Sequence, residues 1–183
     1  MVPPPLNFPK WLAENRHLLQ PPVGNFCLFR SDDYTVMAVG GPNARSDYHF
    51  QPTEEFFYQV QGAMLLKIVE DGEFKDVVIG EGEMFMLPAN TPHSPVRFEG
   101  TVGLVVERTR PDDKDDALRW YCPKLESHPD GPHIVKESRF HCTDLGTQLK
   151  PVIDEWHRDE AGRKCSCGYA VGTRELIGRQ TVA

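Results

Sequence analysis

Short hydrophobic runs separated by turn residues dominate the chain between residues 26 and 107. Several of the runs alternate apolar and polar residues, which is typical of β-strands with one buried face. Many short strands with few helices predict a β-sandwich or barrel. The pattern predicts strands at Phe26–Arg30, Tyr34–Val39, Glu55–Val60, Met64–Glu70, Lys75–Ile79, Met84–Leu87, Ser94–Phe98 and Val102–Glu107.

Two segments outside this region have helical periodicity. Residues 9–19 begin with a proline, which favours a helix start, and place four apolar side chains on one face: Trp11, Leu12, Leu18 and Leu19. Residues 149–156 repeat apolar side chains at the helical spacing as well. By contrast, residues 110–119 are densely charged and predict a solvated loop with no assigned function, and residues 127–134 predict another loop.

These elements predict a mainly β protein with a few peripheral helices. Residues 1–110 are expected to form the barrel with its N-terminal helix. Residues 111–183 are expected to form a C-terminal extension, with a helix and a group of cysteines, packed on the same domain.

Composition narrows the class of protein. The chain has 183 residues and a net charge of −7 without a dense run of Lys or Arg, which disfavours nucleic acids and membrane surfaces as partners. No apolar stretch is long enough to span a bilayer and no signal peptide is visible, so we expect a cytoplasmic protein. Five cysteines, an odd number, argue against a disulfide framework.

Of the seven histidines, only His49 and His93 fall in the strand-rich region. His49 is followed by Glu55 and then Gly62, whereas His93 follows Gly82 and Pro88. These two strings resemble the two motifs of the cupin superfamily, whose fold is a double-stranded β-helix or jelly-roll barrel. Asn90 replaces a motif glycine, and asparagine tolerates left-handed backbone angles better than most residues.

The resemblance also selects the ligand set. The cupin motif places six residues between its Glu and the next Gly, which fits Glu55 and not Glu54. Gln51 stands where most metal cupins have another histidine, so His49, Glu55 and His93 remain. Two imidazoles and one carboxylate favour non-haem Fe(II) with open coordination positions. The alternative is that both histidines are ordinary hydrogen-bonded residues on turns.

Three further charged residues accompany these positions. Arg45 precedes His49 by four residues, Arg97 follows His93 by four, and Glu107 ends an apolar run. Two arginines near a core suggest an anionic substrate, because a guanidinium can bind a carboxylate with two hydrogen bonds. Surface salt bridges are an equally good interpretation of position alone.

Longer strings are similar to the 3-hydroxyanthranilate 3,4-dioxygenase family, including its fungal and bacterial members. They are residues 39–49 (VGGPNARSDYH), 87–98 (LPANTPHSPVRF), 118–122 (LRWYC) and 144–148 (DLGTQ). This resemblance covers nearly the whole chain, from Trp11 to about Cys167.

The resemblance implies a reaction and a set of roles. Family members open 3-hydroxyanthranilate with O₂ to 2-amino-3-carboxymuconate semialdehyde, which closes to quinolinate in NAD synthesis from tryptophan by the kynurenine pathway. It implies that His49, Glu55 and His93 hold Fe(II), with Arg97 and Glu107 at the substrate carboxylate. It places Arg45 beside O₂, and counts Arg45 and Glu55 among the catalytic and substrate-contacting residues.

The C-terminal cysteines depart from the family. Bacterial and yeast members carry a second iron in a site of two Cys-x-x-Cys pairs, but here Leu125 takes one ligand position and the second pair is shortened to Cys165-Ser166-Cys167. The site is either lost or rearranged. A rearranged site would use thiols and perhaps a histidine; the thiols are those of Cys122, Cys142, Cys165 and Cys167.

Two other functions compete with the dioxygenase. One is a cupin dioxygenase for another small aromatic or thiol substrate, and the other is a non-catalytic cupin that stores or senses a ligand. The expected partners are a small aromatic substrate and O₂, with no nucleic acid or membrane. The resemblance suggests a monomer or a homodimer.

Overall fold

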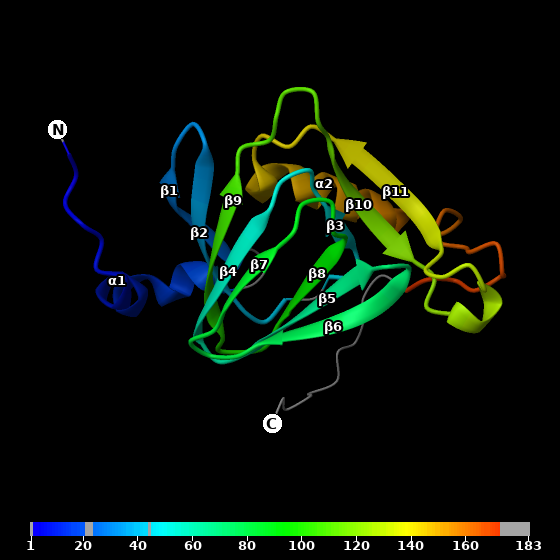
Figure 1. Cartoon of the computed structure of the whole chain (residues 1–183), viewed down its shortest axis with the longest axis horizontal. Coiled ribbons are helices and arrows are strands. Elements are labelled where there is room, and N and C mark those ends of the chain that lie inside the picture. Colours follow the sequence, from blue (N-terminus) through cyan, green and yellow to red (C-terminus); the bar gives the residue numbers. More distant parts are fainter. Residues whose placement is uncertain (1, 21–23, 44, 173–183) are drawn as a thin grey trace.

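Two antiparallel sheets form the body of the protein (Figure 1). The structure, a computed structural model, describes residues 2–20, 24–43 and 45–172. The first sheet has the order β1-β2-β9-β4-β7, and its strands are β1 (Asn25–Arg30), β2 (Tyr34–Gly40), β9 (Val102–Arg108), β4 (Glu55–Gln61) and β7 (Met84–Leu87). The second has the order β11-β10-β3-β8-β5-β6, and its strands are β11 (Ile134–Phe140), β10 (Asp116–Tyr121), β3 (Tyr48–Phe50), β8 (His93–Arg97), β5 (Met64–Glu70) and β6 (Glu73–Ile79).

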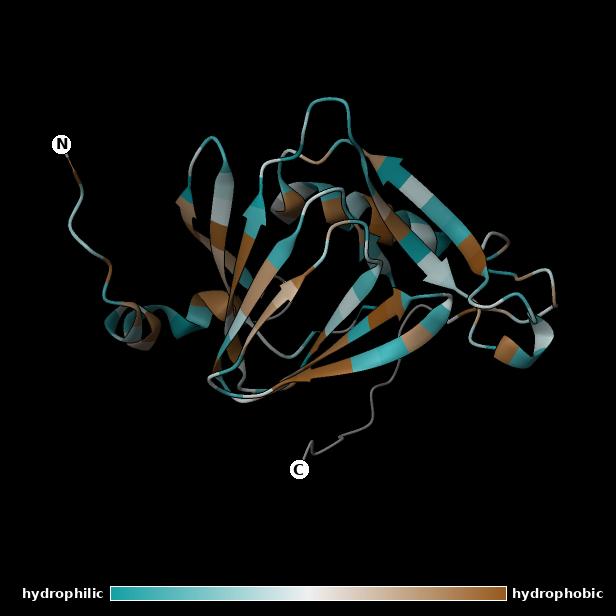
Figure 2. Cartoon of the chain, viewed as in Figure 1, coloured by the Kyte–Doolittle hydropathy of each residue, from teal (hydrophilic) through white to brown (hydrophobic). Residues whose placement is uncertain are grey.

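The sheets face each other across a hydrophobic core, which confirms the mainly β, cupin-type barrel. Most strands carry brown and teal segments in succession in Figure 2, as expected where one face is buried and the other meets water. In β4 the burial alternates residue by residue, with Glu55, Phe57 and Gln59 buried. The core between the sheets contains Met37, Phe57, Met64, Leu66, Ile68, Ile79, Leu87 and Val105.

The helices lie at the periphery (Figure 1). Helix α1 (Phe8–Asn15) begins where the Asn7 side chain accepts a hydrogen bond from the Lys10 amide at 3.0 Å, and it continues as a 3-10 turn, η1 (Arg16–Leu19). Helix α2 (Leu145–Arg158) contains the expected 149–156 segment but is longer. It packs on β10, with the Trp120 and Trp156 rings stacked at 4.6 Å between centroids.

The expected loop at residues 110–119 is wrong in its second half. Strand β10 begins at Asp116 and runs between β3 and β11 in the second sheet. Five of its six residues are buried, so side chains on both of its faces are shielded from water. A strand buried on both faces lacks the apolar–polar alternation that reveals other strands. Strands β3, which has three residues, and β11 were not predicted from the sequence either.

Pairing of β10 with β3 continues the second sheet beyond residue 110. The division of the chain at that residue remains a prediction, and residues 173–183 of the expected extension lie outside the described residues. Within the described ranges, no helix combines the length and apolar character needed to cross a membrane.

Two turns adopt the backbone that their motif residues predict. Asn90 has φ of +61°, in the left-handed region expected for it. Gly62 has φ of +65°, and a Cβ there would lie 2.9 Å from Cγ2 of Thr101. The Asn90 turn comes directly before β8, whose first residue is His93, and therefore sets where that histidine enters the barrel.

Candidate metal and substrate site in the barrel

Two histidines and one glutamate converge inside the barrel. His49, Glu55 and His93 each offer a ligand atom, and these atoms lie within 4.8 Å of one another. All three residues are buried, with exposed fractions of 5%, 5% and 2%. Of the two neighbouring glutamates, Glu55 is the buried one, whereas Glu54 is partly exposed and pairs with Arg108.

Strand register produces this convergence. His49 on β3 is paired directly with His93 on β8, and their rings lie 5.4 Å apart between centroids. Glu55 begins β4 in the opposite sheet, and its Oε2 lies 2.9 Å from Nε2 of His93. Strands from both sheets therefore meet at one point, although His93 follows Glu55 by 38 residues in the chain.

Each histidine is oriented by a second partner. Nδ1 of His93 lies 3.0 Å from the Thr91 carbonyl, and this contact directs Nε2 toward Glu55. Nε2 of His49 lies 2.7 Å from Oδ2 of Asp116. Burial lowers the pKa of His49 and also opposes the charge on His93, but the Glu55 carboxylate raises the pKa of His93 above its usual value.

Arg110 donates hydrogen bonds to two of the buried acids around the site. Its guanidinium donates to Asp116 at 2.8 Å and to Glu107 at 2.8 Å, and it also contacts the Gln51 side chain. Gln51 donates in turn to Glu55 at 3.1 Å. Because every partner is buried, this network holds the carboxylates around the three candidate ligands in fixed positions.

Arg97 differs from the other buried arginine in having no acidic partner. Its exposed fraction is 3%, and within the described residues no carboxylate forms an ion pair with it. NH1 donates to Oε1 of Gln59 at 3.3 Å, and burial lowers the pKa of Arg97 to about 10. Gly103 makes room for this pair, since a Cβ there would lie 2.8 Å from NH1. The guanidinium is positioned to bind an anion from outside the chain.

Glu107 lies beside Glu55 across the β4–β9 pairing. Burial and the Glu55 charge raise the pKa of Glu107 to about 8, and the Arg110 charge opposes the shift. Glu107 can therefore carry a proton near neutral pH, and can donate or accept a hydrogen bond.

The remaining predicted residue, Arg45, lies in the segment before β3. It forms a two-point pair with Asp47, at 3.1 Å from Nε to Oδ1 and 2.5 Å from NH2 to Oδ2. Arg45 keeps 24% of its side chain exposed, so it lies at the edge of the site whereas Arg97 lies inside it.

Two residues of this network, Arg110 and Asp116, were missed because both fall in the charged segment expected to be a solvated loop. Alternation could not reveal Asp116, since β10 is buried on both faces, and Arg110 lies outside any strand or helix. The only usable signal was the apolar Ala117-Leu118 and Trp120-Tyr121 that directly follow the acids.

The chain matches the 3-hydroxyanthranilic acid dioxygenase family over residues 1–157. The 3-hydroxyanthranilate 3,4-dioxygenase of Mycosarcoma maydis is 74% identical to it, over 95% of this chain and 97% of that protein. The enzyme of the same name from Pyricularia oryzae is 56% identical, over 92% and 90%. A cupin-2 domain containing protein from Shewanella frigidimarina has 18% identity and a TM-score of 0.46, over 56% of this chain and 93% of that one. The extent of the family match and the identity to these relatives show that the chain is an enzyme of the 3-hydroxyanthranilic acid dioxygenase family.

Proposed function

We propose that this chain is an Fe(II)-dependent extradiol dioxygenase that opens 3-hydroxyanthranilate with O₂ to 2-amino-3-carboxymuconate semialdehyde. The observation that carries the substrate assignment is Arg97, a buried guanidinium without an acidic partner on the same strand as His93. The semialdehyde closes without an enzyme to quinolinate, so the reaction would serve NAD synthesis from tryptophan. A cytoplasmic location and a monomeric or homodimeric state remain predictions.

His49, Glu55 and His93 would hold the iron. The donor set fits, because two imidazoles and one carboxylate suit Fe(II), and their ligand atoms already converge within 4.8 Å in a buried position. The chemistry that Fe(II) supplies when bound is a set of open coordination positions at which the substrate and O₂ meet and share electron density.

Arg97 would bind the substrate carboxylate and thereby orient the ring. His93 and Arg97 are four residues apart on β8, so their side chains point to the same face of the strand. Gln59 holds one nitrogen of the guanidinium and leaves others free for a carboxylate. A ring fixed at its carboxylate presents one bond to the metal side, and this positioning lowers the entropy cost of the reaction.

Glu107 would contact the substrate, and would not act through Arg97. Its hydrogen-bond partner is Arg110, whereas the partner of Arg97 is Gln59. With its pKa raised to about 8, the Glu107 carboxyl can share a proton with a polar substituent of the substrate.

Arg45 and Glu55 would complete the machinery. Arg45 projects from the edge of the site, where its charge would face the O₂ position, and Asp47 fixes its direction. Glu55 would serve both as a ligand and as a contact at the substrate, because Gln51 and His93 hold its Oε2 at the point where the three candidate ligands meet.

The test is reconstitution of the protein with Fe(II) without oxygen, followed by 3-hydroxyanthranilate and air. We expect the near-ultraviolet absorbance of the semialdehyde, its decay to quinolinate, and oxygen uptake equal to the substrate consumed. Oxygen uptake only with another aromatic or thiol substrate would move the assignment to a different cupin dioxygenase. Iron binding without oxygen uptake on any substrate would favour a non-catalytic cupin.

A further inference from the structure

Arg110, two residues after the end of β9, uses all three nitrogens of its guanidinium as hydrogen-bond donors. Nε and NH2 donate to the Asp116 carboxylate at 2.8 Å and 2.9 Å. NH2 also donates to Glu107 at 2.8 Å and contacts the side-chain oxygen of Gln51. NH1 donates to the Arg108 carbonyl at 2.7 Å. Because Arg110 is only 6% exposed, its orientation is fixed by these protein partners.

Two of these partners each hold a residue of the barrel triad. Oδ2 of Asp116 lies 2.7 Å from Nε2 of His49. The side-chain amide of Gln51 donates to Oε2 of Glu55 at 3.1 Å. One guanidinium therefore reaches two of the three candidate iron ligands, each through a single intervening side chain.

The partners of Arg110 come from both sheets. Asp116 begins β10 and Gln51 directly follows β3, and both strands belong to the second sheet. Glu107 lies on β9 in the first sheet. A guanidinium is planar and its donors diverge at fixed angles, so it sets the positions of its partners relative to one another. Arg110 therefore links the two sheets at the place where the triad converges.

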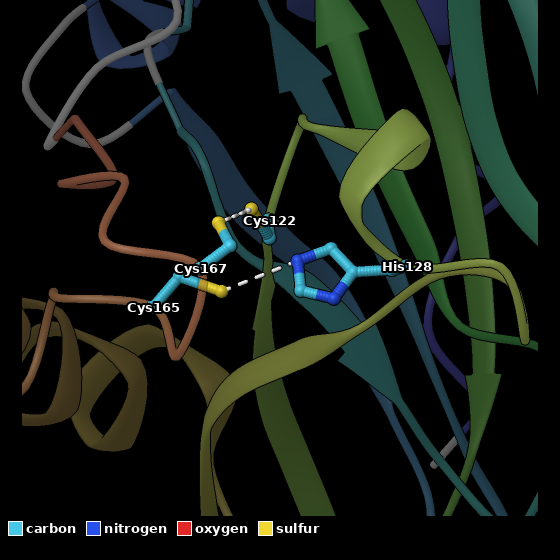
Figure 3. A group of neighbouring side chains, drawn as sticks. All are labelled: Cys122, His128, Cys165 and Cys167. Atoms are coloured by element: carbon cyan, nitrogen blue, oxygen red, sulfur yellow. Dashed lines mark hydrogen bonds between the residues drawn. The ribbon is translucent and has the colours of Figure 1, made fainter.

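Cys142, from the C-terminal part of the chain, closes the network at Asp116. The side chain of Cys142 is buried and hydrogen-bonded to Asp116. Burial and the Asp116 charge raise the pKa of the thiol to about 12, so it is protonated and donates to the carboxylate. The three other cysteines beyond residue 110 lie apart from it and gather with one histidine past the end of β10 (Figure 3). The ligand atoms of this second group lie within 4.8 Å of one another, and its members are Cys122, His128, Cys165 and Cys167.

Neutralising buried acids is one effect of Arg110, since an unpaired buried carboxylate is costly. Neutralisation alone does not explain the contact with Gln51, which is a neutral amide and needs no counter-charge. Gln51 is, however, the residue that donates to Glu55. The contact with Gln51 is therefore best explained by control of the direction in which the Glu55 carboxylate points.

We propose that Arg110 is a positioning residue that sets the directions of His49 and Glu55 together, and thereby determines how tightly the barrel holds Fe(II). It acts through Asp116 and Gln51, and it touches neither the metal position nor the reacting atoms. Outer partners of this kind typically change metal affinity by about 10-fold to 100-fold. The inference rests on the proposed iron site.

The first experiment measures the Fe(II) affinity of the full-length protein by competition with a chelator, without oxygen. Arg110→Ala should weaken binding by about 100-fold, because the supports of two ligands are loosened at once. Arg108→Ala is the matched control, since Arg108 is an exposed arginine two residues earlier whose side chain pairs with Glu54. Its Fe(II) affinity should stay within about twofold of wild type.

Chemical rescue separates positioning from simple neutralisation. Ethylguanidinium contains the atoms that Arg110→Ala removes, whereas ethylammonium carries the same charge without the planar fork. A cavity of about 420 Å³ lined by Arg110 and Glu107 reaches the surface at Asp112, so either cation can enter. Ethylguanidinium should restore the Fe(II) affinity of Arg110→Ala at least tenfold, ethylammonium should not, and neither should change the wild-type affinity.

A double variant tests whether Arg110 acts through Asp116. Asp116→Asn should weaken Fe(II) binding by about tenfold in the wild-type background. In the Arg110→Ala background the same change should cost less than about threefold, because the carboxylate has already lost the guanidinium that directs it. Full multiplication of the two losses would mean that the residues act independently.

If Arg110→Ala fails to fold, Arg110→Lys serves in its place, because lysine keeps the charge but cannot hold three partners in fixed directions. We expect it to bind Fe(II) about tenfold more weakly than wild type. An unchanged Fe(II) affinity in the folded variant, or equal rescue by ethylammonium, would overturn the proposal. A wild-type protein that holds no Fe(II) would refute both the inference and the proposed function. Fe(II) binding without opening of 3-hydroxyanthranilate would refute the proposed reaction alone.

Discussion

The barrel triad of His49, Glu55 and His93 and the cluster of Cys122, His128, Cys165 and Cys167 are built on different supports. The triad lies on three strands from both sheets and is buried. The cluster lies on the ends of elements and on a turn, and Cys167 is exposed. Rigid strands hold side chains more precisely than loops do, which suits chemistry that depends on placement.

The triad and the cluster also differ in the number of ligand atoms that they offer to a metal ion. The triad offers three ligands and leaves coordination positions for reactants, as catalytic sites do. The cluster offers four and leaves none. Within one small chain, the two groups therefore differ in the number of converging donors and in the elements that carry them. These two features separate a site suited to chemistry from a site suited to stability.

The largest effect should follow removal of a triad ligand. Glu55→Ala should abolish both iron binding and dioxygenase activity, because it removes one of three donors. Iron content and oxygen uptake measure the two effects. Glu54→Ala is the matched control, since Glu54 makes a partly exposed ion pair with Arg108, and its activity should stay within about twofold of wild type. Equal loss in both variants would contradict the assignment of Glu55.

The second largest loss of activity should follow removal of the Arg97 guanidinium, which has no acidic partner. Arg97→Ala should lower kcat/KM by about 100-fold, because a charge-assisted hydrogen bond is worth up to about 3 kcal/mol. Iron content should not change, so this variant separates substrate binding from metal binding. Arg108→Ala removes an exposed arginine at the end of the next strand, β9, and should have little effect. A normal kcat/KM in Arg97→Ala would remove the basis for the anionic substrate.

A smaller effect should follow weakening of the support behind a ligand. Asp116→Asn keeps the shape of the side chain but loses the charge that faces His49 and Arg110. Outer-partner substitutions typically lower metal affinity by about 10-fold to 100-fold, and we expect the low end here because Arg110 still holds Glu107. Competitive titration with a chelator measures this affinity, with Asp113→Asn as the exposed control. Unchanged affinity would mean that Asp116 does not support His49.

The smallest effect on catalysis should come from the cluster. Cys165→Ser should lower Tm by a few degrees, because 1 kcal/mol corresponds to about 2–4 °C for a chain of this size. With iron in the barrel, kcat/KM should remain within about twofold of wild type. A loss of activity in the folded, iron-loaded variant would show that the two regions are coupled.

Much of the fold was readable from local pattern. Eight of the strands that the structure contains coincide closely with predicted runs, since each is a short apolar or alternating run bounded by turn residues. Strands β3 and β10 were not readable, because a three-residue strand is too short for periodicity and a strand buried on both faces has none. Helix α2 extends beyond its apolar period at both ends, where residues 146–148 and 157–158 are glycine or polar.

Some residues of the two sites were also predictable from the sequence, and others were not. His49, Glu55 and His93 were predicted because their motif spacing is local and directly visible in the chain. Asp116 and Arg110 were not predicted. Asp116 is one of several neighbouring aspartates in the sequence, and only the pairing of β10 with β3 shows that its carboxylate lies 2.7 Å from His49. Cys142 was an equal candidate for the cluster until the structure separated it from the other thiols.

Order and spacing along the chain were enough to predict the strand-rich barrel, the residues able to hold a metal in it, and the family resemblance. The pairing of charges, which leaves Arg97 without an acidic partner, depends on the folded arrangement of the strands. The folded arrangement also decided that His128 joins the three cysteines. Both depend on distances between residues far apart in sequence, and these arise only when the two sheets and α2 pack together.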